Sequence, residues 1–176
     1  MRNTDLPSIR LWHWAHIGTW AIASMLATLT SSYAAEPSAA CTLLQPAELE
    51  SALGGKAARF SGHHLESADV CSGQVGTRKV VIRTAKRQRQ DGGAVERKGI
   101  ETARRMGAQV EIKTEGDLTC STLIPPASLP QMGFNTTCSV FRAGKVLAVE
   151  VTAPSRQDMV PMEAVRSLVQ KAATRL

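Results

Sequence analysis

Four cysteines constrain the fold of this chain more than any other feature of its sequence. They are Cys41, Cys71, Cys120 and Cys138, and all of them follow a segment with the composition of an export signal. An even number of cysteines in an exported chain indicates disulfides, and four cysteines allow three different pairings. We predict Cys41–Cys71 and Cys120–Cys138, because each pair encloses a compact stretch of one or two structural elements. The sequence contains no Cys-x-x-Cys motif, which argues against metal ligation and redox chemistry.

The N-terminal segment has the composition of a secretory signal peptide. Arg2 and Arg10 supply positive charge, residues 17–29 (IGTWAIASMLATL) carry none, and small residues precede Ala34. The apolar run is about 13 residues, whereas a membrane-spanning helix needs roughly 20. We therefore predict a bacterial signal peptide at residues 1–34, cleaved near Ala34, with no transmembrane anchor after processing. The protein would then be periplasmic or secreted.

Two alternatives for the N-terminus stay open. The first is an uncleaved N-terminal anchor. The second is lipidation of Cys41, although Glu36 and Pro37 separate this cysteine from the apolar run and the residue that a lipobox requires is missing. Under the signal-peptide interpretation, residues 35–40 are a short leader and residues 41–176 form a single domain.

Hydrophobic periodicity and turn residues predict an α+β fold. The order of the expected elements is helix, strands, helix, strands, helix, which favours one mostly antiparallel sheet with about three helices packed on one face and stapled by disulfides. The predicted helices are 46–53, 94–106 and 158–175, and the predicted strands are 56–65, 69–75, 78–86, 109–114, 118–124, 134–141 and 145–152.

The sequence offers little for catalysis. It contains no nucleophile elbow, phosphate-binding loop, zinc-protease helix or dinucleotide fingerprint. C-terminal to Ala34 the only histidines are His63 and His64, and adjacent residues of a strand point to opposite faces. We therefore predict no enzyme activity, no cofactor and no metal. A small hydrolase or metal-dependent enzyme around these histidines is the alternative.

The distribution of charge suggests a binding surface. Residues 78–105 carry ten basic and three acidic side chains. Within this basic stripe Arg83, Lys86, Arg87 and Arg89 have no obvious local partner, so they are the candidate anion-binding residues. The alternative interpretation is an ordinary solvated surface.

The small number of aromatic residues in the predicted domain limits which kinds of molecule it is expected to bind. All three tryptophans and the single tyrosine lie within the first 33 residues, so only Phe60, Phe134 and Phe141 remain in the predicted domain. Binding of single-stranded nucleic acid relies on stacking of bases on aromatic rings. Nucleic acid is therefore not the expected partner. An anionic envelope lipid or polymer fits the basic stripe better than nucleic acid does.

The run CTLLQPAELESALGG at 41–55 resembles a pattern in poorly characterised bacterial exported proteins and lipoproteins. In those proteins a cysteine precedes a Leu-rich Pro-Ala-Glu helix that ends in glycine, and a second cysteine follows about thirty residues later, as Cys71 does here. The hairpin at 141–151 (FRAGKVLAVEV) and the helix that follows it are also similar to theirs. The resemblance implies a small, sensor-like α+β domain and no catalytic residues.

These features together predict an exported module of the bacterial envelope that binds without catalysing a reaction. In the favoured hypothesis the basic stripe at 78–105 docks an anionic envelope component. In the alternative, the protein binds or inhibits an envelope protein through the sheet face or the loop at 125–133.

Overall fold

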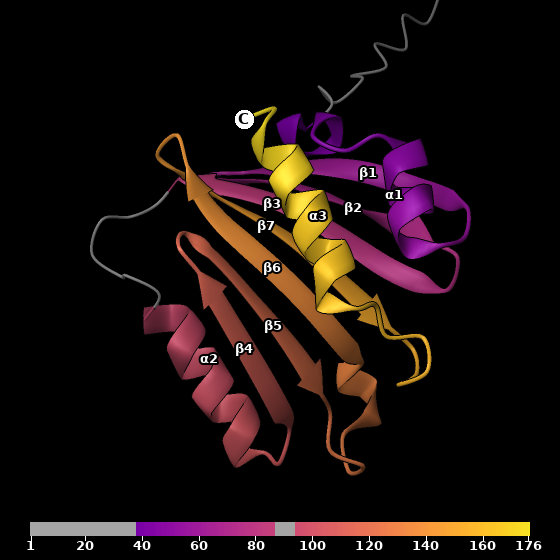
Figure 1. Cartoon of the computed structure of the whole chain (residues 1–176), viewed down its shortest axis with the longest axis vertical. Coiled ribbons are helices and arrows are strands. Elements are labelled where there is room, and N and C mark those ends of the chain that lie inside the picture. The colour runs from indigo at the N-terminus through magenta and orange to yellow at the C-terminus, as the bar shows by residue number, and fades with distance from the viewer. Residues whose placement is uncertain (1–37, 87–93) are drawn as a thin grey trace, which may run out of the picture. The chain divides into compact units, whose positions relative to one another are not determined.

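The computed structural model describes residues 38–86 and 94–176, which belong to one compact unit, Ala35–Leu176. The unit contains one sheet, three α-helices and two short 3-10 helices, η1 and η2 (Figure 1). In chain order the elements are η1 (Ala39–Thr42), α1 (Pro46–Leu53), β1 (Ala57–Leu65), β2 (Ala68–Val75), β3 (Arg78–Lys86), α2 (Ala94–Arg105), β4 (Gln109–Glu115), β5 (Leu118–Ile124), η2 (Pro130–Met132), β6 (Phe134–Arg142), β7 (Lys145–Ala153) and α3 (Met162–Ala173).

The seven strands form a single antiparallel sheet. Their order is β1-β2-β3-β7-β6-β5-β4, so the first three strands and the last four each form a meander. The chain leaves the centre of the sheet after β3 and starts the second meander at the far edge with β4. The second meander then returns to the centre, where β7 pairs with β3 over eight residues. The predicted α+β fold with a mostly antiparallel sheet is confirmed.

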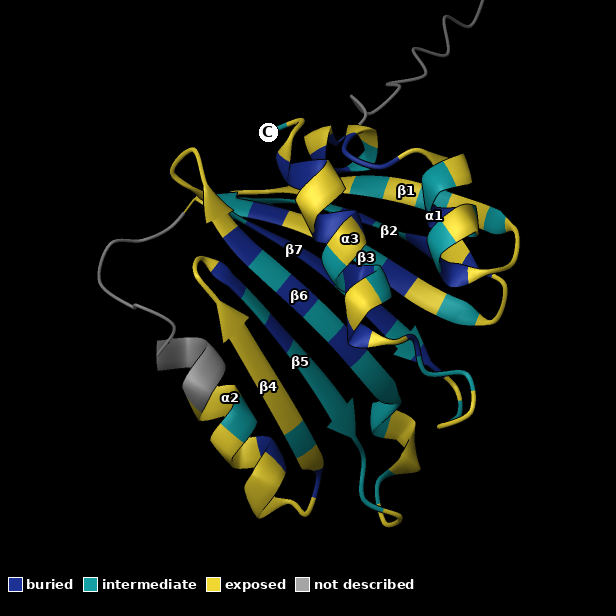
Figure 2. Ribbon diagram, viewed as in Figure 1, coloured by how far each residue is buried: buried dark blue, intermediate teal, exposed yellow. Residues whose placement is uncertain are grey.

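The core lies between one face of the sheet and the helices α1 and α3. Buried side chains alternate along the central strands, as expected where only one face is covered (Figure 2). On α3 the buried residues recur at helical spacing and include Val165, Leu168, Val169 and Ala172, which are the residues that the sequence predicts to point inward. They join Ile82 and other aliphatic side chains of the strands in one cluster. The core is therefore aliphatic.

Helix α1 has well-defined ends. Pro46 occupies its first turn, where a missing N–H costs nothing, and Gln45 and Glu48 form a reciprocal capping box. Leu49 and Leu53 are its buried residues. The helix ends at Gly54, whose φ of 67° suits glycine.

Both predicted disulfides are present. Cys41–Cys71 joins η1 to β2 with an S–S distance of 2.02 Å. Cys120–Cys138 joins two residues that face each other directly on β5 and β6. Each disulfide therefore fastens one of the two meanders on the core side of the sheet.

Two helices differ from their predicted form. Helix α3 begins at Met162 rather than near residue 158, because Pro161 occupies the N-cap position and lacks the N–H that a helix interior needs. The sequence also predicts an apolar stripe of Val95, Gly99, Ala103 and Met106 on α2. Ala103 is buried but Met106 is 45% exposed, and the side chain of Val95 lies outside the described residues. Among the described residues, α2 makes substantial contact with β4 alone, so it adds little to the core.

A search for membrane-spanning segments among the described residues finds no helix of sufficient length and apolar character to cross a bilayer.

Candidate functional site

The structure describes two of the four candidate anion-binding residues. Arg83 and Lys86 both lie on β3 and both are exposed. Lys86 pairs with Lys145, whereas Arg83 pairs with Ala148 and lies on the opposite face of the sheet. Their side chains therefore do not converge on one ligand. Arg87 and Arg89 lie outside the described residues.

Lys86 belongs to a different group of cations, which the sequence did not reveal. It lies directly opposite Lys145 on β7, and Lys145 in turn lies directly opposite Arg142 on β6. Directly opposed residues of an antiparallel pair share a face, with their Cβ atoms about 4.5–5.5 Å apart. Lys86, Lys145 and Arg142 thus form a line across three neighbouring strands, which we call the cationic row. All three side chains are exposed, at the end of the sheet where the β6–β7 hairpin projects (Figure 2).

The cationic row has no acidic partner within residues 38–86 and 94–176. None of its side chains forms an ion pair there, although Lys171 and Arg175 pair with Glu48, and Arg166 pairs with Glu115. Like charges that face each other across strands destabilise a sheet. This arrangement of three cations therefore does not stabilise the fold.

Sequence reasoning missed Arg142 and Lys145 for two reasons. The sequence predicts a hairpin whose connection is Arg142-Ala143-Gly144, so it places Arg142 in the turn, whereas the structure places Arg142 on β6 directly opposite Lys145. The pairing of β3 with β7 was not predictable, because these strands are separated in sequence by three strands and a helix. The pairing of Arg142 with Lys145 therefore depends on the exact length of the turn, and the pairing of Lys86 with Lys145 depends on the strand order.

Other residues of the basic stripe have structural roles. The guanidinium group of Arg78 donates hydrogen bonds to the backbone carbonyls of Asp158 (2.7 Å) and Leu53 (3.1 Å). Arg104 donates to the carbonyl of Val110 at 3.2 Å. Arg78 and Arg104 therefore use their guanidinium groups within the protein.

The two histidines lie on β1. His63 pairs with Val70 and His64 with Asp69, so the two imidazoles occupy opposite faces of the sheet. The Nδ1 atom of His64 is 2.6 Å from a carboxylate oxygen of Asp69. In the part of the chain that the structure describes, no three His, Cys, Asp or Glu side chains are grouped so that they could hold a metal ion.

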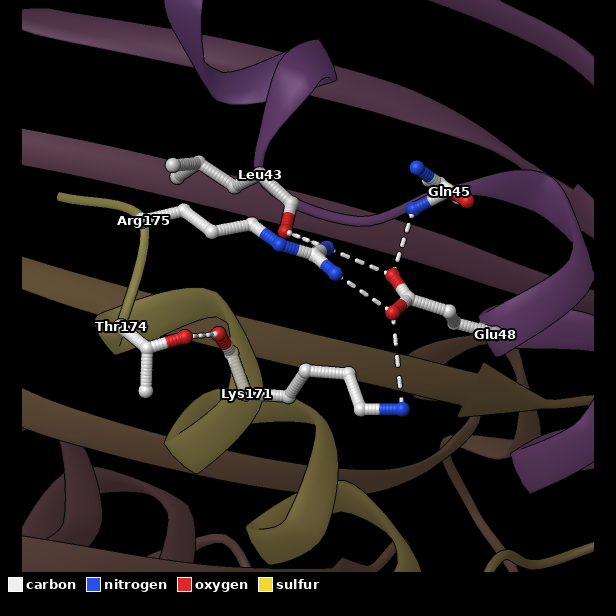
Figure 3. Close-up of polar contacts among 6 residues, drawn as sticks. All are labelled: Leu43, Gln45, Glu48, Lys171, Thr174 and Arg175. Atoms are coloured by element: carbon white, nitrogen blue, oxygen red, sulfur yellow. Dashed lines mark hydrogen bonds and ion pairs between the residues drawn. The ribbon is translucent and has the colours of Figure 1, made fainter.

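The most connected polar cluster of the described residues joins α1 to the end of α3 (Figure 3). Both oxygens of the Glu48 carboxylate accept hydrogen bonds from Arg175, at 2.6 Å each, and Arg175 also donates to the carbonyl of Leu43. The hydrogen bond from Arg175, helped by the backbone N–H of Gln45, lowers the pKa of Glu48 from 4.5 to about 2. Because both terminal nitrogens of Arg175 and both oxygens of Glu48 are engaged within the protein, we interpret this cluster as a structural clamp.

A shallow, open hollow lies between β4, β5 and α3. Its charged lining consists of Lys113, Glu115, Glu163 and Arg166, and Arg166 forms an ion pair with Glu115. Opposite charges therefore offset each other in this hollow, which makes it a weaker candidate than the cationic row.

The face of the sheet opposite the core is a separate surface. It carries a polar network in which Asn135 donates to Glu150 at 2.7 Å and Thr137 donates to Asn135 at 2.6 Å. The predicted partner-binding loop at 125–133 is irregular except for η2. Neither surface shows an uncompensated charge comparable to the cationic row.

Comparison of the chain with protein-family models gives no match, and comparison with curated protein sequences gives none either. The resemblance to exported bacterial proteins therefore stays a prediction. The candidate site is defined by its geometry alone.

Proposed function

We propose that this protein is an exported binding module that docks clustered phosphate or carboxylate groups on its cationic row. One observation carries the proposal: Lys86, Lys145 and Arg142 face one another in register and have no acidic partner among the described residues. A row of cations spaced by adjacent strands concentrates positive potential on a short line. Such a line matches an array of anions better than a single small anion.

We also propose that the protein acts outside the cytosol, in the bacterial envelope. The two disulfides support an oxidising location outside the cytosol. The envelope of a bacterium presents abundant phosphate and carboxylate groups at its surfaces, which is the chemistry that the row suits. We infer no catalytic step, because docking by charge needs only the cations themselves.

Binding of the exported protein to immobilised heparin, a polymer of closely spaced anions, tests this proposal. We compare the wild type with a row variant that carries Lys86→Gln, Arg142→Gln and Lys145→Gln. The matched control carries Lys56→Gln, Lys79→Gln and Arg156→Gln, which remove the same charge at the other end of the sheet, where all three side chains are exposed.

We expect the row variant to lose about one unit of salt dependence per cation removed, and about fivefold in affinity for each. The control variant should lose much less salt dependence and much less affinity for heparin. Equal losses in the two variants would show that only net charge matters and would overturn the proposal.

A further inference from the structure

We infer that the partner of the cationic row is the surface of an anionic lipid bilayer, into which apolar side chains beside the row insert. This inference rests on the proposed function, because it identifies the partner of the same site. It is carried by a second line of residues at this end of the sheet, one position further in along the central strands.

This second line is apolar throughout. Along β3, β6 and β7, the residue next to each member of the cationic row is Ala85, Phe141 or Val146. Direct pairing extends the line to β2 and β1, so that it crosses five neighbouring strands. We call this line the apolar row, and its members are Leu65, Ala68, Ala85, Val146 and Phe141.

The largest side chains of the apolar row are exposed. Leu65 is 54% exposed and Phe141 is 39% exposed, whereas the three smaller members between them are half-buried. Only four large hydrophobic side chains of the described residues are exposed to this degree, and two of them belong to this row. Two of these four side chains therefore lie at the end of the sheet that carries the cationic row.

This combination distinguishes a membrane from a polymer in solution. A dissolved polyanion needs only cations, and an exposed Leu or Phe beside them gains nothing. A bilayer surface offers anionic headgroups and, a few ångströms deeper, an apolar layer, so peripheral proteins use basic and large apolar side chains together. The adjacent rows supply both kinds of contact.

The faces of the two rows determine the orientation. Because side chains alternate along a strand, the cationic row and the apolar row lie on opposite faces of the sheet. Both rows can touch one plane only if the strand ends point toward it. The protein would therefore dock with these strand ends toward the bilayer and with the β6–β7 hairpin, which projects from this end of the sheet (Figure 1), nearest to its surface.

Among residues 38–86 and 94–176, few acidic groups lie near these rows. Glu66 is exposed in the β1–β2 turn, Asp117 is exposed in the β4–β5 turn, and Asp69 is engaged by His64. The first two would weaken attraction to an anionic bilayer at the ends of the rows. The centre of the cationic row, where Lys145 lies between Lys86 and Arg142, carries only positive side chains.

The test compares two probes with the exported protein: immobilised heparin, and vesicles of phosphatidylglycerol and phosphatidylethanolamine. The apolar variant carries Leu65→Ser and Phe141→Ser. Its control is Met106→Ser, which removes an exposed large apolar side chain from the end of α2. Chemical unfolding of each variant shows that it is folded.

We expect the apolar variant to bind the vesicles about tenfold more weakly and heparin as tightly as the wild type does. The row variant should lose affinity for both probes, and Met106→Ser should lose it for neither. If the apolar variant binds vesicles like the wild type, or if heparin is bound and the vesicles are not, the lipid assignment is wrong while the proposed function stands. If the row variant binds heparin like the wild type, the proposed function itself fails.

Discussion

At the scale of single residues, close packing leaves glycine as the only residue that fits at Gly73. A Cβ atom at this position of β2 would lie 2.5 Å from the ring of Phe60, which covers the strand on its core side. We expect Gly73→Ala to destabilise the protein by about 1–3 kcal/mol, because the ring must move. Gly99→Ala on α2 is the control. No atom lies within 4 Å of the added methyl group, so helix propensity should make this variant about 0.5–1 kcal/mol more stable.

Chemical unfolding measures both variants. Equal stability of Gly73→Ala and the wild type would mean that Phe60 does not pack as described.

A second prediction concerns Ala143, which has a strained backbone conformation and lies next to the cationic row. Ala143 has a φ of 50° in the turn between Arg142 and Lys145, and Gly144 follows with a φ of 76°. Two positive φ angles in a two-residue hairpin turn favour Asn-Gly. We expect Ala143→Asn to raise the free energy of unfolding by roughly 1 kcal/mol, and to leave heparin binding unchanged because the cations keep their register. A fall in stability would contradict this assignment of the turn.

At the scale of helices and strands, the clamp between α1 and α3 predicts a dependence on pH. The pKa of Glu48 is lowered from 4.5 to about 2, so its contribution to stability is complete above pH 4.5 and is lost as the pH falls toward 2. In Glu48→Gln this contribution is absent at every pH. The difference in unfolding free energy between wild type and variant should therefore be largest above pH 4.5 and shrink toward pH 2. A difference that stays constant across this range would exclude the ion pair as its cause.

The elements also show which parts of the fold can be predicted from sequence. The strand β3, with its alternating burial, and the helix α1, with its capping residues, were predicted to their ends, whereas α3 was predicted to begin about four residues too early. The stripe on α2 was misjudged, because periodicity shows that a face is apolar but not that another element covers it. The hairpin of the cationic row was predicted, but its register was not, because a turn one residue shorter than expected brings Arg142 opposite Lys145; the pairing of Lys86 with Lys145 joins strands that are distant in sequence.

At the scale of the whole molecule, the two disulfides fasten separate halves of the sheet. They close loops with sequence separations of 30 and 18 residues. By the chain-entropy estimate each contributes about 3–4 kcal/mol, a large share of the 5–15 kcal/mol that is usual for a domain. We expect Cys41→Ala with Cys71→Ala, and Cys120→Ala with Cys138→Ala, to lower the unfolding free energy by similar amounts.

The intact mass of the exported protein, measured before and after reduction, establishes that both bonds form. It should rise by about 4 Da on reduction, two hydrogens for each disulfide. The same measurement tests the predicted loss of residues 1–34. An unreduced mass equal to the reduced mass would contradict the covalent framework.

Under the proposed function, the cationic row serves binding at some cost to stability. The most direct test is Lys145→Thr, because Lys145 is the cation that faces both of the others. Unfolding free energy and heparin affinity are measured on the same preparation. We predict that the variant is more stable than the wild type by roughly 0.2–1 kcal/mol, since two like-charge contacts are removed, and that it binds about fivefold more weakly. A variant that is less stable, or that binds heparin as tightly as the wild type, would contradict the account.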